Sequence, residues 1–152
     1  MITNQQKTVL DKESIPKVDL NFMNNTHFEE IEMVKELGEY ITDFQDNKTT
    51  SKANDITKAL SAWLEHTDAH FARENALMQE TQFPALPIHM QEHERSLTQL
   101  KMVVETWINE QDIEQLSDYI FELWPAWFNA HVNSMDMMTA RFAVMNGYKE
   151  TN

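Results

Sequence analysis

The sequence predicts an all-α fold, an up-down-up-down antiparallel four-helix bundle preceded by an irregular N-terminal arm. Three observations predict it. Apolar residues recur at alternating spacings of three and four along four long segments, as on one face of a helix. The 152 residues include only two glycines and four prolines, so few positions interrupt a helix. The segments are joined by short connections, which make consecutive helices antiparallel neighbours.

The arm is expected over residues 1–20 and the bundle over residues 21–152. Within the arm, Ile15, Val18 and Leu20 are spaced so that they can lie against the bundle. The first helix is expected from Asn21, and its inward stripe consists of Met23, His27, Glu30, Val34, Leu37, Ile41 and Phe44. A polar turn at 46–51 ends it, and Ser51 or a neighbouring threonine is expected to cap the next helix.

The next two helices meet at a proline-containing turn. The stripe of the second helix consists of Ile56, Leu60, Trp63, Thr67, His70, Glu74 and Leu77. This helix is expected to end near Gln82, because Pro84 and Pro87 follow. Pro87 suits the first turn of the third helix. The third stripe consists of Leu86, His89 or Met90, His93, Leu97, Leu100, Val104 and Trp107.

The fourth helical segment follows a polar break at 110–112 and has two irregular features. Its expected stripe consists of Ile113, Leu116, Ile120, Leu123, Trp127, His131, Met138 and Phe142. Pro125 lies inside it, so we expect a kink or a helix in two pieces. His131 and Asp136 are five residues apart, and side chains at that spacing diverge around a straight helix. A locally widened turn between them is therefore expected.

Composition excludes several kinds of chemistry. There is no cysteine, so the chain has no disulfide, no thiolate metal site and no cysteine nucleophile. The formal net charge of −13 disfavours binding to nucleic acid or to anionic membranes. Residues 1–20 lack the apolar core of a signal peptide, and no apolar run approaches the length that spans a bilayer. We therefore expect a cytoplasmic protein that does not insert into membranes.

Seven side chains that can bind metals lie on or near the inward faces. His70 and Glu74 are four residues apart, as are His89 and His93, and this spacing places both members of a pair on one helix face. The full set is His27, His70, Glu74, His89, His93, His131 and Asp136. Buried ionisable groups are unfavourable unless they are paired or bind a metal. Imidazoles with carboxylates suit Fe, Mn or Zn, and seven donors suit two ions that share carboxylates better than one tetrahedral ion.

Two other classes of metal protein are disfavoured by the spacing. No glutamate lies three residues before any histidine, whereas the carboxylate-rich di-iron bundles carry Glu-x-x-His on two helices. The zinc-protease motif H-E-x-x-H is also absent. A histidine-dominated site for two metal ions remains.

This pattern resembles the hemerythrin family, in its bacterial branch. The family carries one motif on each of its four helices, and all four are present here in order, over about residues 20–145. They are an early His, His-x-x-x-Glu, His-x-x-x-His and His-x-x-x-x-Asp. Residues 23–27, the His70-Phe71 pair with Met78 beyond it, and Trp127 one turn before His131 are also similar to the family.

The resemblance implies two Fe ions, ferrous or ferric, bridged by Glu74, Asp136 and an oxo or hydroxo group. It implies that His89, His93 and His131 complete one six-coordinate iron. It also implies that His27 and His70 bind the second iron, which keeps an open position where O2 binds reversibly. Phe71, Trp127, Phe128 and Val132 are candidates for an apolar wall around the O2 position. The expected partner is O2, and the expected role is oxygen storage, delivery or sensing, with no catalytic residue assigned.

Glu30 departs from the family, which usually has an apolar residue at this position. Its carboxylate is a candidate extra metal ligand that would occupy the open position. Alternatively it accepts hydrogen bonds from a nearby group or turns outward. If Glu30 modifies or occupies the open site, the alternative function is a di-iron peroxidase, an oxidase or an iron-handling protein. His66, one turn before His70, is either an outer partner of the site or a solvent-exposed side chain.

Overall fold

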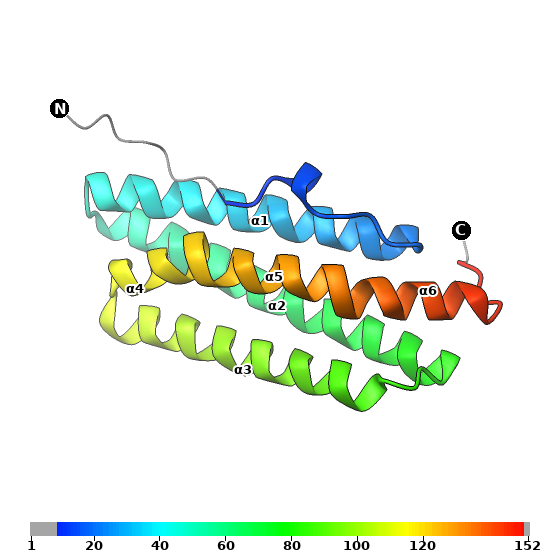
Figure 1. The fold of residues 1–152 in the computed structure, drawn as a ribbon. Helices are drawn as coiled ribbons and strands as arrows, with labels where there is room; N and C mark the ends of the chain where they lie inside the picture. The colour runs from blue at the N-terminus through cyan, green and yellow to red at the C-terminus, as the bar shows by residue number, and fades with distance from the viewer. Residues whose placement is uncertain (1–8, 151–152) are drawn as a thin grey trace.

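The computed structural model describes residues 9–150, and within them it contains helices and no strand. The three long helices are α1 (Asn21–Asp46), α2 (Thr50–Thr81) and α3 (Leu86–Glu110). A fourth helical segment is made of α4 (Ile113–Asp118), η2 (Tyr119–Leu123), α5 (Trp124–His131), η3 (Val132–Asp136) and α6 (Met137–Met145). Consecutive segments run in opposite directions (Figure 1). The expected all-α bundle is confirmed; the part of the arm at residues 1–8 lies outside the described residues.

Local sequence sets the ends of the helices. The Thr49 hydroxyl accepts a hydrogen bond from the Lys52 amide at 3.2 Å, which confirms the expected threonine cap of α2. Gln82 ends α2 in the left-handed conformation, with φ at 55°. Pro87 lies in the first turn of α3, where its missing N–H leaves no hydrogen bond unmade.

A kink or a helix in two pieces was expected at Pro125, and of these two alternatives the second does not occur, because the fourth segment remains helical through Pro125. The backbone instead widens into a π turn, η2, immediately before the turn that contains Pro125. A wider turn relieves the clash that a proline ring makes with the carbonyl one turn earlier. A second π turn, η3, lies between His131 and Asp136, which confirms the widened turn expected from their five-residue spacing.

The inward face of this segment differs from the expected stripe. Leu123 and Met138, expected inside, are 56% and 62% exposed. The residues that follow them, Trp124 and Thr139, are buried instead. A π turn takes up one residue more than an α turn, so the inward face moves one position along the chain at these places.

The described part of the N-terminal arm, residues 9–20, lies along the bundle (Figure 1). Ile15, Val18 and Leu20 in this part are buried, as expected. Asn24 of α1 attaches it. Its side-chain oxygen accepts a hydrogen bond from the Val18 amide at 2.8 Å, and its side-chain nitrogen donates to the Val18 carbonyl at 2.9 Å. Both contacts are buried, so their loss leaves polar groups without partners.

Replacing Asn24 with alanine is expected to lower the free energy of unfolding by about 1–3 kcal/mol, because the Val18 amide and carbonyl lose their partners inside the protein. Urea denaturation of both variants measures the effect. Asn25→Ala is the matched control, since Asn25 is exposed on the same helix. Equal destabilisation by the two substitutions would contradict this role of Asn24.

Among the described residues, no helix combines the length and apolar character required to cross a bilayer.

Candidate metal centre

The bundle brings all seven candidate ligands together near one end. His27 lies in the N-terminal half of α1, and His89 and His93 lie in the N-terminal half of α3. The ligands of α2 and of the fourth segment lie in the C-terminal halves of those segments. Because neighbouring helices are antiparallel, these positions meet at the same level. None of the seven side chains is more than 4% exposed: His27, His70, Glu74, His89, His93, His131 and Asp136.

The seven residues form two overlapping groups, and in each group the candidate ligand atoms lie within 4.8 Å of one another. One group consists of Glu74, His89, His93, His131 and Asp136. The other consists of His27, His70, Glu74 and Asp136. Glu74 and Asp136 belong to both, which is the arrangement that two ions sharing carboxylates require.

Glu74 directs its two oxygens to different groups. Its Oε2 atom lies 2.6 Å from Nε2 of His70 and 4.0 Å from Nε2 of His27. Its Oε1 atom lies 3.3 Å from Nε2 of His93 and 3.5 Å from Nε2 of His89. One oxygen therefore faces the group with two histidines, and the other faces the group with three.

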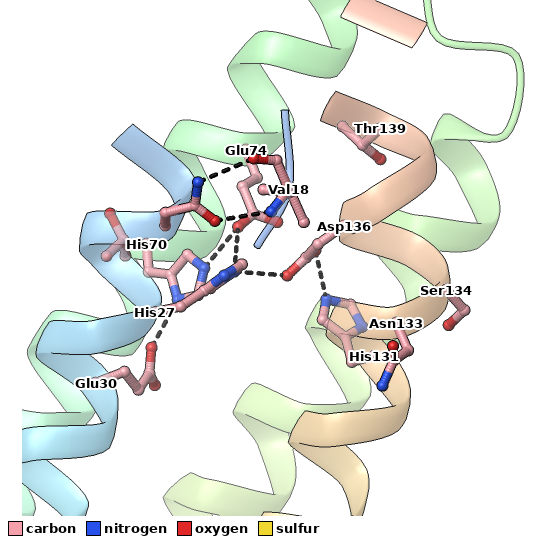
Figure 2. A network of polar contacts seen from close by, with 12 residues as sticks. Val18, His27, Glu30, His70, Glu74, His131, Asn133, Ser134, Asp136 and Thr139 are labelled. Atoms are coloured by element: carbon pink, nitrogen blue, oxygen red, sulfur yellow. Dashed lines mark hydrogen bonds and ion pairs between the residues drawn. The ribbon is translucent and has the colours of Figure 1, made fainter. Parts of the chain in front are cut away.

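Asp136 divides its oxygens in the same way. Its Oδ2 atom lies 2.8 Å from Nε2 of His27, and its Oδ1 atom lies 3.0 Å from His131 and 3.1 Å from His89. Figure 2 shows His27 between Asp136 and Glu74, with His131 beyond Asp136. The π turn η3 allows His131 and Asp136, on the same segment, to converge.

Several buried atoms support a bound metal. Among the described residues, Glu74 Oε1, His93 Nε2 and Asp136 Oδ1 have no hydrogen-bond partner. Glu74 Oε1 and His93 Nε2 are only 3.3 Å apart, yet their mutual orientation does not make a hydrogen bond. Two polar atoms that lie close together without a hydrogen bond are expected where both point toward a metal ion between them. The donor set of imidazoles and carboxylates therefore fits transition-metal ions.

Hydrogen bonds behind the site orient four of the imidazoles. The Nδ1 atoms of His89, His93 and His131 lie 2.7–2.8 Å from side-chain oxygens. Their partners are the Thr139 hydroxyl, the Asn75 amide and the Glu92 carboxylate, in that order. His70 is held in the same way, by Glu30. An N–H at Nδ1 leaves the lone pair of Nε2 free for a metal.

Asn75, Glu92 and Thr139 were not anticipated from the sequence. Asn75 and Glu92 are direct neighbours of the ligands Glu74 and His93, and polar residues are common at such positions on a helix. Their roles depend on contacts between helices, since each binds a histidine of a different helix. No spacing rule within one helix indicates them.

Comparison with known proteins agrees with this geometry. Residues 19–143 match the family model described as the hemerythrin HHE cation binding domain. The chain belongs to the hemerythrin family. It is 31% identical over 127 residues to a bacteriohemerythrin of Aquifex aeolicus (strain VF5), covering 84% of this chain and 92% of that protein. It is 37% identical over 93 residues to a bacteriohemerythrin of Ralstonia nicotianae, covering 61% of this chain and 66% of that protein. No solved structure matches the chain.

Glu30, the candidate extra metal ligand, lies behind His70. Its Oε2 atom accepts a hydrogen bond from Nδ1 of His70 at 2.7 Å, opposite the nitrogen that faces Glu74 (Figure 2). Its Oε1 atom accepts from Trp63 Nε1 at 3.0 Å and from the Thr67 hydroxyl at 2.9 Å. Within the described chain, Glu30 belongs to neither ligand group. This placement corresponds to the hydrogen-bonding alternative rather than to a metal ligand.

His66 lies one step further out and is 20% exposed. Its Nδ1 atom is 3.7 Å from Glu30 Oε2, and its Nε2 atom is 3.3 Å from Glu29 Oε2. It is therefore an outer neighbour of Glu30 that reaches the surface.

Three of the four residues predicted to form an apolar wall are aromatic, and each lies against a candidate ligand histidine. Phe71 stacks on His93 with ring centroids 4.1 Å apart, and Trp127 stacks on His131 at 4.6 Å. Phe128 meets His27 edge-on at 5.6 Å. Val132, the remaining candidate, is fully buried in the turn after His131.

The carboxylates change the protonation of two histidines. Burial disfavours charge on His131, but Asp136 and Glu92 outweigh burial and raise its pKa to about 10. Burial also opposes charge on His70, yet Glu74 and Glu30 raise its pKa well above the ordinary value. Burial raises the pKa of Asp136, but His131 and its other partners outweigh burial and hold it well below the usual range.

Metal loading of the metal-free protein at pH 7 is expected to release at least about two protons per chain, because His70 and His131 must lose theirs to bind metal. Since raising the pH removes these competing protons, metal affinity is expected to rise with pH from neutral pH through the pKa of His131. Anaerobic titration with Fe²⁺ in weakly buffered indicator solution measures both effects. Loading without proton release would contradict the prediction.

Proposed function

We propose that the protein is a non-haem di-iron protein that binds O2 reversibly, for oxygen storage, delivery or sensing. Membership of the hemerythrin family supports a di-iron, oxygen-binding type of function. One structural observation carries the proposal further. Both shared carboxylates offer one oxygen to each histidine group, so Glu74 and Asp136 can bridge a pair of ions.

The two groups are unequal, and this supports an open position. One group offers five residues and the other offers four, with the two carboxylates counted in both. The ion held by His27 and His70 therefore has one protein ligand fewer. A bound ferrous pair would supply the electrons that O2 takes up on binding. His27, His70, Glu74 and Asp136 would hold the ion with the open position.

The aromatic wall supports reversibility. Phe71 and Phe128 are at most 4% exposed and lie against ligand histidines. By excluding water, these rings would limit the loss of partly reduced oxygen from the site, a loss that would leave the irons oxidised.

A cycle of oxygenation tests this function. The protein is loaded anaerobically with Fe²⁺, its iron content is measured, and its visible spectrum is followed in air and again after O2 is removed. We expect about two irons per chain, as two ligand groups require, and a visible band that appears in air and disappears without O2. Metal-free protein carried through the same cycle is the control. Prompt, irreversible oxidation would overturn reversible binding.

Irreversible oxidation would favour the alternative, a di-iron peroxidase, oxidase or iron-handling protein. One observation keeps this alternative open. The buried carboxylate of Glu30 lies directly behind His70, a candidate ligand of the ion with the open position. A negative charge at that point favours the ferric state.

A further inference from the structure

Glu30 is a buried anion joined to a single candidate ligand. It is 2% exposed, and three side chains donate hydrogen bonds to it, from Trp63, Thr67 and His70. Trp63 Nε1 and the Thr67 hydroxyl both donate to one carboxylate oxygen, and Nδ1 of His70 faces the other, a set of partners that suits a carboxylate without a proton. Because Trp63 and Thr67 hold Oε1, the other oxygen remains directed at His70.

No other described candidate ligand has such a partner. The partners of His89 and His93 are the neutral Thr139 hydroxyl and Asn75 amide. Glu92, behind His131, is charged but 30% exposed, so water screens it. The Glu30 charge is screened much less, since an interaction between charges is stronger in a low-dielectric interior.

We propose that Glu30 is a positioning residue that holds His70 with Nε2 toward the metal and lowers the reduction potential of the ion bound by His27 and His70. The proposal rests on the di-iron function above. A carboxylate that accepts the Nδ1 hydrogen bond of a ligand histidine makes the imidazole a stronger donor and fixes its ring. A stronger donor and a nearby negative charge both stabilise the ferric state. Binding of O2 withdraws electrons from the irons, so Glu30 also strengthens O2 binding.

Two substitutions test the carboxylate. Glu30→Gln keeps the size and removes the charge, but its one oxygen can accept either from His70 or from Trp63 and Thr67, not from both. Glu30→Leu removes the charge and every acceptor. Glu29→Gln is the matched control, because Glu29 is the adjacent residue of α1 and its side chain is 68% exposed. Loss of its charge is screened by solvent.

The midpoint potential of the iron-loaded proteins is measured by spectroelectrochemistry, in which mediators carry electrons from the electrode. We expect a positive shift in Glu30→Gln, a larger one in Glu30→Leu and the smallest one in Glu29→Gln. Affinity for redox-inert Zn²⁺ is measured by competition with a chelator. The loss of an outer partner is expected to weaken it about 10- to 100-fold in Glu30→Leu, and less in Glu30→Gln.

Unchanged potentials in both Glu30 variants, with two irons bound, would overturn the proposal while leaving the di-iron function intact. A wild-type protein that cannot hold two irons would instead overturn the function itself. Glu30→Leu also leaves the buried Trp63 and Thr67 donors without an acceptor. If that variant does not fold, Glu30→Gln decides the outcome, because it retains the size of the side chain and one of the two acceptor oxygens.

Discussion

Replacing Glu74 with glutamine is expected to destroy the two-metal centre, reducing bound iron from about two ions per chain to one or none. Glu74 is the side chain of α2 that faces both ligand groups, with one oxygen toward His70 and the other toward His93. Glutamine has nearly the same shape but no charge, and its amide nitrogen is a poor ligand. It therefore cannot bridge two cations. Iron analysis and the visible spectrum of the oxidised protein with azide measure the loss.

Glu65→Gln provides the control for this experiment. Glu65 lies on the exposed face of α2, so the substitution removes the same charge from the same helix without touching either ligand group. Its iron content and spectrum are expected to match those of the wild type. If Glu74→Gln also retains full iron content and an unchanged azide spectrum, Glu74 is not a bridging ligand.

Truncation of Phe128 to alanine is expected to lower the free energy of unfolding by about 3–5 kcal/mol, the usual cost of removing a buried phenylalanine ring. Phe128 is 1% exposed, stacks on Trp124 at 4.6 Å and meets His27 at 5.6 Å. Its removal leaves a cavity beside the candidate metal centre, and the surroundings of such a cavity relax only in part. Urea denaturation of chelator-treated protein measures the change without a contribution from metal loss.

Leu123→Ala is the informative comparison for Phe128→Ala. The apolar pattern places Leu123 on the inward stripe of the fourth segment, but the structure exposes 56% of it after the π turn η2. We expect a change within about 0.5 kcal/mol, as for a surface substitution. If Leu123→Ala were the more damaging of the two, the inward face would follow the unwidened helical period instead.

Much of the fold could be predicted because helical periodicity and helix ends are local properties. The start of α1 at Asn21 and the end of α2 just before Gln82 follow from nearby residues. The π turn of η3 was also predictable, because His131 and Asp136 are five residues apart and must reach one centre. The turn at η2 carries no such pair, so Pro125 was expected to break or bend the helix instead.

The candidate ligands could be predicted as a set because spacing along a helix determines which side chains share a face. Their division between two ions could not be derived from spacing alone. It depends on which oxygen of Glu74 and of Asp136 faces which imidazole, and these contacts join residues of four different helices.

The sequence by itself determined that four amphipathic helices would bring five imidazoles and two carboxylates into one core, since each helix carries its own share of the pattern. Only the tertiary structure decided which side chains form hydrogen bonds with those ligands on the side away from the metal. Glu30 lies on the inward stripe together with His27. The stripe alone does not show whether its carboxylate binds the metal or accepts hydrogen bonds. Packing of α1 against α2 places its carboxylate among donors from Trp63, Thr67 and His70. A buried carboxylate is stable where such donors surround it, and their arrangement exists only once the helices have packed together.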